Sequence, residues 1–383
     1  MDVSHADVLA DTLRQCHVAL TTAVPGHGAT QTFDAWRSTT GDPFSFHEEV
    51  AVGMAHGAAL RGRRAAVLLK AHGFLKAANA IADSLSAGTT AGLLYIVFHD
   101  PTGAHSDSIL DIEDAACDLD LPVHRPHPSE ASPTLAMALQ HSERQELPHL
   151  VILDADTVTD AAASDPAACP PPAVTVERDV ARRVCCPLFA EYQHAVFRAR
   201  CEGRNPDTVE RPSLPRVPDD LPADYRTAAA PYVSLFEALS SVPRAVTTGD
   251  TTVGTLFALP PYDAVDLCTY MGGSIPLAAG AAAVGDTPAW AVTGDFGFVA
   301  AGHLGLLEGR QRDLPLTIVL LQNGVASATG GQPVAAQAVD TVLAGYDDAT
   351  LRLNAPTDPS ACRNALHTAA SRDGLTIVHA DYT

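Results

Sequence analysis

Residues 294–297 read Gly294-Asp295-Phe296-Gly297, and Asn323-Gly324 begins 28 residues after Asp295. A helix-like segment at residues 299–311 and an apolar run at residues 314–321 separate the two motifs. The order is therefore strand end, Gly-Asp turn, helix, strand end and Asn-Gly turn, which is typical of a parallel βαβ unit. Because consecutive parallel strands end at the same edge of a sheet, we expect Asp295 and Asn323 to lie side by side there.

The two motifs supply the donors that a small cation and a phosphate group require. Asp295 and Asn323 offer a carboxylate and an amide oxygen, which are ligands that Mg²⁺ accepts together with substrate phosphates. The backbone N–H groups at the start of the helix after Gly294 form an anion site suited to a diphosphate. An ordinary βαβ turn with a surface Asp is the alternative interpretation of the same residues.

The motif pair resembles the signature of thiamine diphosphate (ThDP) enzymes, in which Gly-Asp-Gly precedes an Asn by just under thirty residues. The resemblance implies that Mg²⁺ is bound by Asp295, Asn323 and the backbone carbonyl of Val325. It also implies a cofactor-binding set in this segment: Gly294, Asp295, Phe296, Gly297 and Asn323. Phe296 replaces the second Gly of the signature, at a position that contributes mainly backbone.

A second match lies at residues 46–51, which read Phe-His-Glu-Glu-Val-Ala and precede a run of small residues at 53–61. ThDP enzymes carry a Glu at the head of such a helix, and the resemblance assigns this role to Glu48. That residue is expected to hydrogen-bond the pyrimidine N1′ and to drive general acid–base catalysis through the cofactor. Glu49 is the better candidate for simple stabilisation of the helix dipole.

A third match begins at Thr269 and continues through Met271-Gly272-Gly273-Ser274-Ile275-Pro276. The resemblance implies that Met271 is wedged between the two cofactor rings and that Gly272 belongs to the same cofactor-binding loop. It also implies that the carbonyl of Thr269 accepts a hydrogen bond from the 4′-amino group. The alternative interpretation of Met271 is core filling, which is the usual role of Met.

Two loops of the N-terminal half are expected to face the substrate. One contains Pro25-Gly26-His27-Gly28, and the other follows an apolar run and contains Lys70 and His72. The chain has only two lysines, Lys70 and Lys76. By resemblance His27 and His72 are catalytic candidates, while Lys70 and His105 are candidates for binding the substrate. A Lys at this edge could bind a carboxylate or another anionic group.

Alternation of apolar strand patterns with helical patterns predicts an α/β protein with two doubly wound parallel sheets. The resemblance implies that both have the ThDP-binding fold. Residues 1–160 are expected to form the pyrimidine-binding domain, and residues 229–383 the diphosphate and Mg²⁺ domain. Residues 161–228, which are rich in Pro and Arg, are expected to be a linker with one helix. The predicted strands are residues 17–23, 65–69, 92–98, 149–153, 245–248, 289–293, 316–321 and 376–380.

Composition excludes several classes of function. The formal charge of −21 argues against binding to nucleic acid. The eight Cys are scattered without a Cys-x-x-Cys pair, which argues against zinc and iron–sulfur ligation in this chain. No run of eighteen apolar residues and no basic region before an apolar stretch occur, so we expect a cytoplasmic protein without membrane partner or signal peptide.

Scattered shorter matches resemble the large subunit of indolepyruvate:ferredoxin oxidoreductases; they include His99-Asp100-Pro101, Thr248-Gly249-Asp250 and Thr329-Gly330-Gly331-Gln332-Pro333. The cluster-free layout resembles phosphonopyruvate and sulfopyruvate decarboxylases. The expected reaction is non-oxidative, ThDP- and Mg²⁺-dependent decarboxylation of a 2-oxo acid to an aldehyde. Three alternatives remain: a carboligase that uses the same enamine, a ThDP subunit of an oxidoreductase with a separate iron–sulfur partner, and a non-catalytic, regulatory protein of the ThDP fold. The resemblance also implies a homodimer or a dimer of dimers with sites at the interface. Phosphonopyruvate, sulfopyruvate and an arylpyruvate are substrate candidates.

Overall fold

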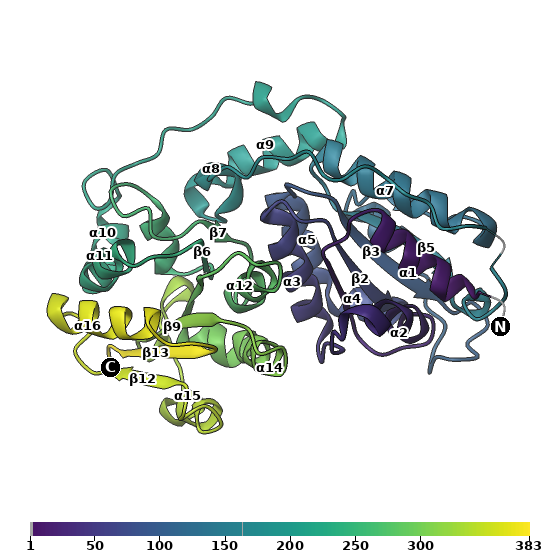
Figure 1. Cartoon of the computed structure of the whole chain (residues 1–383). Helices are drawn as coiled ribbons and strands as arrows, with labels where there is room; N and C mark the ends of the chain where they lie inside the picture. Colours follow the sequence, from purple (N-terminus) through teal and green to yellow (C-terminus); the bar gives the residue numbers. More distant parts are fainter. Residues whose placement is uncertain (1–2, 163) are drawn as a thin grey trace. The chain divides into compact units, whose positions relative to one another are not determined.

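The computed structural model describes residues 3–162 and 164–383, which form two compact units (Figure 1). The first unit comprises Met1–Glu177 and Phe197–Pro206, and the second comprises Arg178–Val196 and Asp207–Thr383. Residues 161–228, the expected linker, are therefore divided between the two units, and one boundary falls within helix α9 (Ala190–Cys201).

The first unit is built on a five-stranded sheet with the order β1-β2-β3-β5-β4, in which every neighbouring pair is parallel. Every residue of β3 is buried, so both faces of the sheet are covered by helices, as parallel sheets require. The strands are β1 (Leu20–Ala23), β2 (Ala65–Lys70), β3 (Leu93–His99), β4 (Val123–His124) and β5 (His149–Asp154).

The helices of the first unit pack in two groups. Helix α1 contacts α2 and α7, whereas α3 lies against β1, β2 and α5. The apolar core includes Phe33, Trp36 and Phe98, all buried. The helices are α1 (His5–Gln15), α2 (Ala29–Thr40), α3 (Glu48–Leu60), α4 (Ala71–Lys76), α5 (Ala78–Ala87), α6 (Glu113–Asp118) and α7 (Ala131–Gln145), with short 3₁₀ turns at Pro128–Glu130 and Ala155–Thr157.

The second unit is built on a six-stranded parallel sheet with the order β12-β13-β9-β8-β6-β7. A short antiparallel hairpin, β10 with β11, follows the end of β9. The strands are β6 (Val246–Gly249), β7 (Leu267–Cys268), β8 (Ala289–Gly294), β9 (Leu316–Gln322), β10 (Val325–Ala326), β11 (Gln332–Pro333), β12 (Thr350–Leu353) and β13 (Thr376–Asp381).

Helix α12 packs on β6, β8 and α14, whereas α11 packs on α16. The segment after β8 changes from α-helix to a π-helical turn, Phe298–Gly302, before it continues as α14; such turns are frequent at functional sites. The helices are α8 (Val180–Arg183), α10 (Ala223–Ala229), α11 (Val233–Ser241), α12 (Ser274–Ala283), α13 (Asp295–Gly297), α14 (His303–Gln311), α15 (Ala336–Leu343) and α16 (Pro359–Ala370), with 3₁₀ turns at Pro187–Phe189, Pro206–Thr208, Ala230–Tyr232, Val253–Ala258 and Ser327–Thr329.

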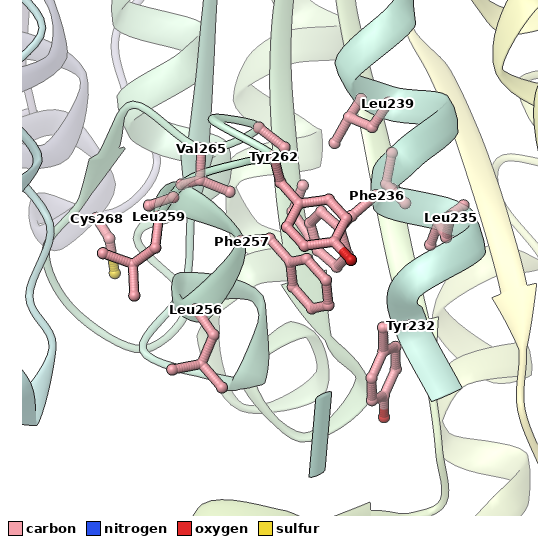
Figure 2. Packing of buried hydrophobic residues seen from close by; sticks show 14 of the residues in the cluster. Tyr232, Leu235, Phe236, Leu239, Leu256, Phe257, Leu259, Tyr262, Val265 and Cys268 are labelled. Carbon is pink, nitrogen blue, oxygen red and sulfur yellow. The ribbon is translucent and has the colours of Figure 1, made fainter. Parts of the chain in front are cut away.

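An aromatic cluster anchors α11 in the core of the second unit (Figure 2). The rings of Phe236 and Phe257 stack with centroids 3.9 Å apart, and Tyr262 meets Phe257 edge-on at 4.9 Å. Both arrangements are ones that aromatic pairs prefer. Because Tyr232 precedes α11 and lies in the same core cluster, this packing also places the Tyr232 side chain.

The predicted fold class is confirmed, and all eight predicted strands are present with shifted ends. The first strand begins at Leu20 rather than at residue 17, because His17 lies directly after the C-cap of α1 and its φ of 56° is not that of a strand. Strands β4, β7 and β12 are short edge strands that periodicity did not indicate. None of the helices in the described part of the chain has the length and apolarity that a membrane crossing requires.

Candidate functional site

The turns after β8 and β9 lie side by side at the carboxyl edge of the second sheet, because Gly294 pairs with Leu321 in the parallel register. The Asp295 carboxylate connects these two turns. Its Oδ2 accepts the backbone N–H of Asn323 at 3.0 Å and that of Gly324 at 2.7 Å. The predicted proximity of Asp295 and Asn323 is therefore confirmed.

The Asn323 side chain has a defined orientation. Its Oδ1 accepts the N–H of Val325 at 3.0 Å, and its Nδ2 donates to the hydroxyl of Tyr232 at 2.8 Å and to Ser327 Oγ at 3.1 Å. Because a backbone N–H can only donate, the amide atom that faces Val325 is the oxygen. The amide oxygen of Asn323 therefore belongs to the same turn whose backbone N–H groups bind the Asp295 carboxylate.

A cavity of about 160 Å³ opens beside these two turns. Its walls carry carboxylate, amide, hydroxyl and backbone groups from residues far apart in the sequence. The lining includes most of the predicted cofactor and metal residues of this half: Met271, Gly294, Asp295, Phe296, Gly297, Asn323 and Val325. Phe296 is 43% exposed, so its side chain does not fill the core.

The chemistry of the donor set fits a divalent cation bound to a diphosphate. Burial raises the pKa of Asp295, although backbone N–H groups of Gly324, Phe296 and Asn323 act in the opposite direction. The side chain is only 2% exposed. A bound cation would offset the cost of burying this carboxylate, since an opposite charge favours the ionised form.

The loop that carries Met271 enters the same cavity. Met271 is 40% exposed, which contradicts the alternative of core filling, whereas Thr269 is buried. Gly272 has φ of +84°, and a Cβ at this position would lie 2.8 Å from the Cβ of Ala301. Only glycine therefore fits this close approach between the loop and the π-helical turn.

Asp250 connects the Met271 loop to the turn after β8, a role that the sequence did not indicate. Its buried carboxylate accepts the N–H of Ser274 at 3.0 Å and the hydroxyl of Thr293 at 2.5 Å. A Cβ on Gly297 would lie 2.7 Å from Asp250 Oδ2. Burial raises the pKa of Asp250, with the hydroxyl and N–H donors acting against it. The sequence signal was Thr248-Gly249-Asp250, one of the short matches to indolepyruvate:ferredoxin oxidoreductases, which assigned no role to Asp250.

In the first unit, Glu48 begins α3 and forms an ion pair with Lys76, whose Nζ lies 2.7 Å from Glu48 Oε2. The Glu48 side chain is 13% exposed. A Cβ on Gly73 would lie 3.0 Å from Glu48 Cγ, so this glycine leaves room for the carboxylate. Glu49 instead accepts a hydrogen bond from Asn79 Nδ2 at 3.0 Å.

The His27 loop packs on two neighbouring strands of the first sheet. A Cβ on Gly26 would lie 2.5 Å from Lys70 Cγ, and one on Gly28, which has φ of +83°, would lie 2.4 Å from the ring of Phe98. His27 stacks on His105 with ring centroids 3.6 Å apart. The two glycines therefore allow the loop to lie flat on β2 and β3.

The structure brings His27, Lys70 and His105 together, because Lys70 Nζ donates to the carbonyl of His105 at 2.5 Å. His105 Nε2 in turn lies 3.5 Å from Asp156 Oδ1. His72 has a different partner, since its Nε2 lies 2.8 Å from Ser108 Oγ. The four predicted substrate-facing residues are thus all near the carboxyl edge of the first sheet.

Each unit carries one half of the predicted residue set. The first unit holds Glu48, His27, His72, Lys70 and His105, and the second unit holds the Thr269–Gly272 loop and the turns after β8 and β9. The two halves have different chemistry. Acid–base and cationic groups gather in the first unit, whereas the second presents oxygen ligands and backbone donors.

Comparison with known proteins identifies two family models, and no match was found among curated proteins. Residues 3–116 match the N-terminal TPP-binding domain of thiamine pyrophosphate enzymes, and residues 248–380 match the C-terminal TPP-binding domain. Together these matches cover most of both sheets.

Solved structures share the fold at low sequence identity. A protein of Mycobacterium smegmatis described as a thiamin diphosphate-dependent enzyme is 15% identical with a TM-score of 0.68, covering 100% of this chain and 99% of that one. The ThDP-dependent 4-hydroxybenzoylformate decarboxylase of Rhodococcus jostii RHA1 is 13% identical with a TM-score of 0.68, covering 99% of each chain. Benzoylformate decarboxylase of Polynucleobacter necessarius is 12% identical with a TM-score of 0.64, covering 99% of this chain and 98% of that one. The chain belongs to the superfamily of thiamine diphosphate-dependent enzymes.

Proposed function

We propose that this ThDP enzyme decarboxylates a 2-oxo acid to an aldehyde without oxidation and that it requires Mg²⁺. The cavity beside Asp295 is the observation that carries the proposal. There an oriented Asn323, a buried carboxylate and an exposed Met271 line one space. The names of two structural neighbours, both decarboxylases of aryl 2-oxo acids, support the reaction class.

When bound, the cofactor supplies the carbon nucleophile and the electron sink for loss of CO₂. The residues of this chain bind and orient it. Asp295, Asn323 and the carbonyl of Val325 would hold Mg²⁺, and the N–H groups at the start of α13 would receive the diphosphate. Met271 and the Thr269 carbonyl would receive the rings.

Glu48 is proposed to hold and release the proton at its carboxylate next to the aminopyrimidine. Its ion pair with Lys76 orients the carboxylate at the head of α3. Lys70, with its Nζ at the His105 carbonyl, would attract the substrate carboxylate to the carboxyl edge of the first sheet. His72, hydrogen-bonded to Ser108, is proposed to move a proton at Nε2 during product release.

We further propose that the protein works as a homodimer or a dimer of dimers, with the two residue sets of one site drawn from different subunits. Sedimentation of the purified protein with and without cofactor tests this association. A monomer that turns over substrate would contradict the proposal.

Binding is tested first by calorimetric titration of ThDP, with and without Mg²⁺, into wild type and two variants. We expect wild type to bind ThDP only with Mg²⁺ and Glu48→Gln to bind it in the same way. Binding of ThDP to Asp295→Asn should no longer depend on Mg²⁺. Glu48→Gln and Asp295→Asn each replace one carboxylate oxygen by an amide NH₂ group, so both variants keep the shape of the side chain. If wild type bound ThDP equally well with and without Mg²⁺, the assignment of the metal site would be contradicted.

Turnover is then measured with a panel of 2-oxo acids, comprising phosphonopyruvate, sulfopyruvate, an arylpyruvate and the benzoylformates. Release of CO₂ and aldehyde by wild type, and not by Glu48→Gln, is the expected result. An acyloin product in place of aldehyde would identify a carboligase. Reduction of a dye that depends on coenzyme A and an added iron–sulfur protein would identify the oxidoreductase subunit.

A further inference from the structure

His27 is oriented by Gln31, a residue in the first turn of α2. Gln31 Oε1 accepts the backbone N–H of Gly28 at 2.7 Å, and Gln31 Nε2 lies 3.0 Å from His27 Nδ1. Gly28 is the N-cap of α2, so the Gln31 side chain also satisfies one of the free N–H groups at the helix start. One side chain thus joins the helix cap to the imidazole.

These two contacts determine which imidazole nitrogen carries hydrogen. The N–H of Gly28 can only donate, so the amide atom facing it is oxygen and the NH₂ group faces His27. Because that NH₂ can only donate, Nδ1 of His27 must accept with its lone pair. The neutral ring therefore carries its hydrogen on Nε2.

The surroundings of His27 also favour the neutral ring. Protonation of Nδ1 would place one N–H against another, since the Gln31 amide cannot reverse without losing the Gly28 bond. Burial lowers the pKa of His27, and the charges of His105 and Lys70 act in the same direction, whereas Asp156 and Asp100 oppose them.

We propose that His27 is a neutral hydrogen-bond donor, through Nε2–H, to an oxygen of the 2-oxo acid, and that Gln31 is the positioning residue that imposes this tautomer. The inference rests on the proposed function and assigns a role within the same site. A neutral imidazole of this kind can polarise a carbonyl oxygen and stabilise the negative charge that develops on it.

Two other roles are excluded by this arrangement. His27, His105 and Asp156 place possible ligand atoms within 4.8 Å of one another, a spacing compatible with a metal ion. An Nε2 that carries hydrogen offers no lone pair to a metal, however. A neutral imidazole is also a very weak acid at Nε2, so His27 is not assigned the protonation of carbon.

The tautomer is tested directly by long-range ¹H–¹⁵N spectra of protein labelled at the histidine nitrogens. We expect His27, assigned by its absence from His27→Gln, to be the Nε2–H tautomer at neutral pH. Gln31→Glu keeps the shape but presents only acceptors. It should therefore shift the hydrogen of His27 to Nδ1 and raise the pKa of the ring. Gln31→Met, which offers neither donor nor acceptor, should give a mixture of tautomers.

An Nδ1–H tautomer or an even mixture in wild type would overturn the inference, as would an unchanged spectrum in Gln31→Glu. These spectra need no turnover, so their outcome is separate from that of the proposed function. Failure of wild type with bound cofactor to decarboxylate any 2-oxo acid would refute the proposed function instead.

The role as donor is tested by two substitutions of His27. Gln can place an N–H near the former Nε2, whereas Glu presents only oxygen acceptors at neutral pH. We expect His27→Gln to keep kcat/KM within roughly tenfold of wild type and His27→Glu to lose about a hundredfold or more, which is typical for loss of one oxyanion donor. Equal losses in both variants would contradict the donor role.

Discussion

Gly297→Ala should destabilise the second unit, because the turn after β8 lies directly against the buried carboxylate of Asp250. The new Cβ would lie 2.7 Å from Asp250 Oδ2 and 3.2 Å from Met271 Cγ. Asp250 cannot move away without loss of its bonds from Ser274 and Thr293. Overpacking costs about 1–3 kcal/mol and each lost hydrogen bond about 1 kcal/mol. We expect a decrease of about 2–4 kcal/mol in the free energy of unfolding.

Urea unfolding followed by tryptophan fluorescence provides the assay. The chain has two tryptophans, Trp36 in the first unit and Trp290 in the second, and both are buried. A Trp36→Phe background therefore confines the signal to the second unit. Gly345→Ala is the matched control, since a Cβ there meets nothing within 4 Å. It should be neutral or slightly stabilising through its effect on the unfolded chain.

A double-mutant cycle isolates the contact itself. Asp250→Ala removes the oxygen that the new Cβ would meet, so Gly297→Ala should cost less in that background than in wild type. Residues in contact commonly show coupling of about 0.5–3 kcal/mol. Equal stability of Gly297→Ala and Gly345→Ala would contradict a close contact with Asp250, as would strict additivity of Gly297→Ala and Asp250→Ala.

Three further predictions concern pH, a buried ion pair and the cofactor loop. Burial and a neighbouring carboxylate raise the pKa of Asp83 from 3.8 to about 6. The folded state therefore binds more protons than the unfolded state in this window, and the contribution of Asp83 to stability falls as pH rises from about 4 to 6. Asp83→Asn should remove that decline. The difference in free energy of unfolding between variant and wild type, measured by urea unfolding, should therefore change between about pH 4 and pH 6. A constant difference across this range would contradict the prediction. Arg64→Met should cost about 3–5 kcal/mol, because the side chain is only 2% exposed and its loss leaves Glu143 without the 2.7 Å partner. Arg310→Met, at an exposed pair, should cause no measurable loss in the same urea assay; equal losses in the two variants would argue against burial as the cause. Met271→Ala should leave the apo protein as stable as wild type, because the side chain is 40% exposed, while calorimetry should show weaker ThDP binding; the opposite pattern would restore core filling.

The fold class follows from local patterns along the chain. Apolar runs of strand length that alternate with helical patterns predict parallel sheets, and the connection between two consecutive strands leaves little choice of handedness. For this reason the spacing of Asp295 and Asn323 was enough to predict that their turns lie together. The edge strands escaped prediction because two to four residues carry too little periodicity.

The residues that hold the site in shape could not be found in this way. Asp250 and Gly297 are 47 residues apart in the sequence but are in contact. The ion pair of Glu48 with Lys76 likewise joins the start of α3 to the end of α4. Such contacts depend on how the elements pack, which local periodicity does not encode. Division of residues 161–228 between two units is likewise a property of long-range packing.

The amino-acid sequence by itself determined the class of fold, the carboxylate and amide at one sheet edge, and the glutamate at the head of α3. It did so because each of these depends on a few neighbouring residues and on regular strand order. Only the tertiary structure decided the inferred tautomer of His27, through Gln31 and the Gly28 N–H. It also decided that Asp250 accepts hydrogen bonds from Ser274 and Thr293, which belong to two different segments. Both depend on the direction of single hydrogen bonds, and that direction is established only when the side chains are packed in place.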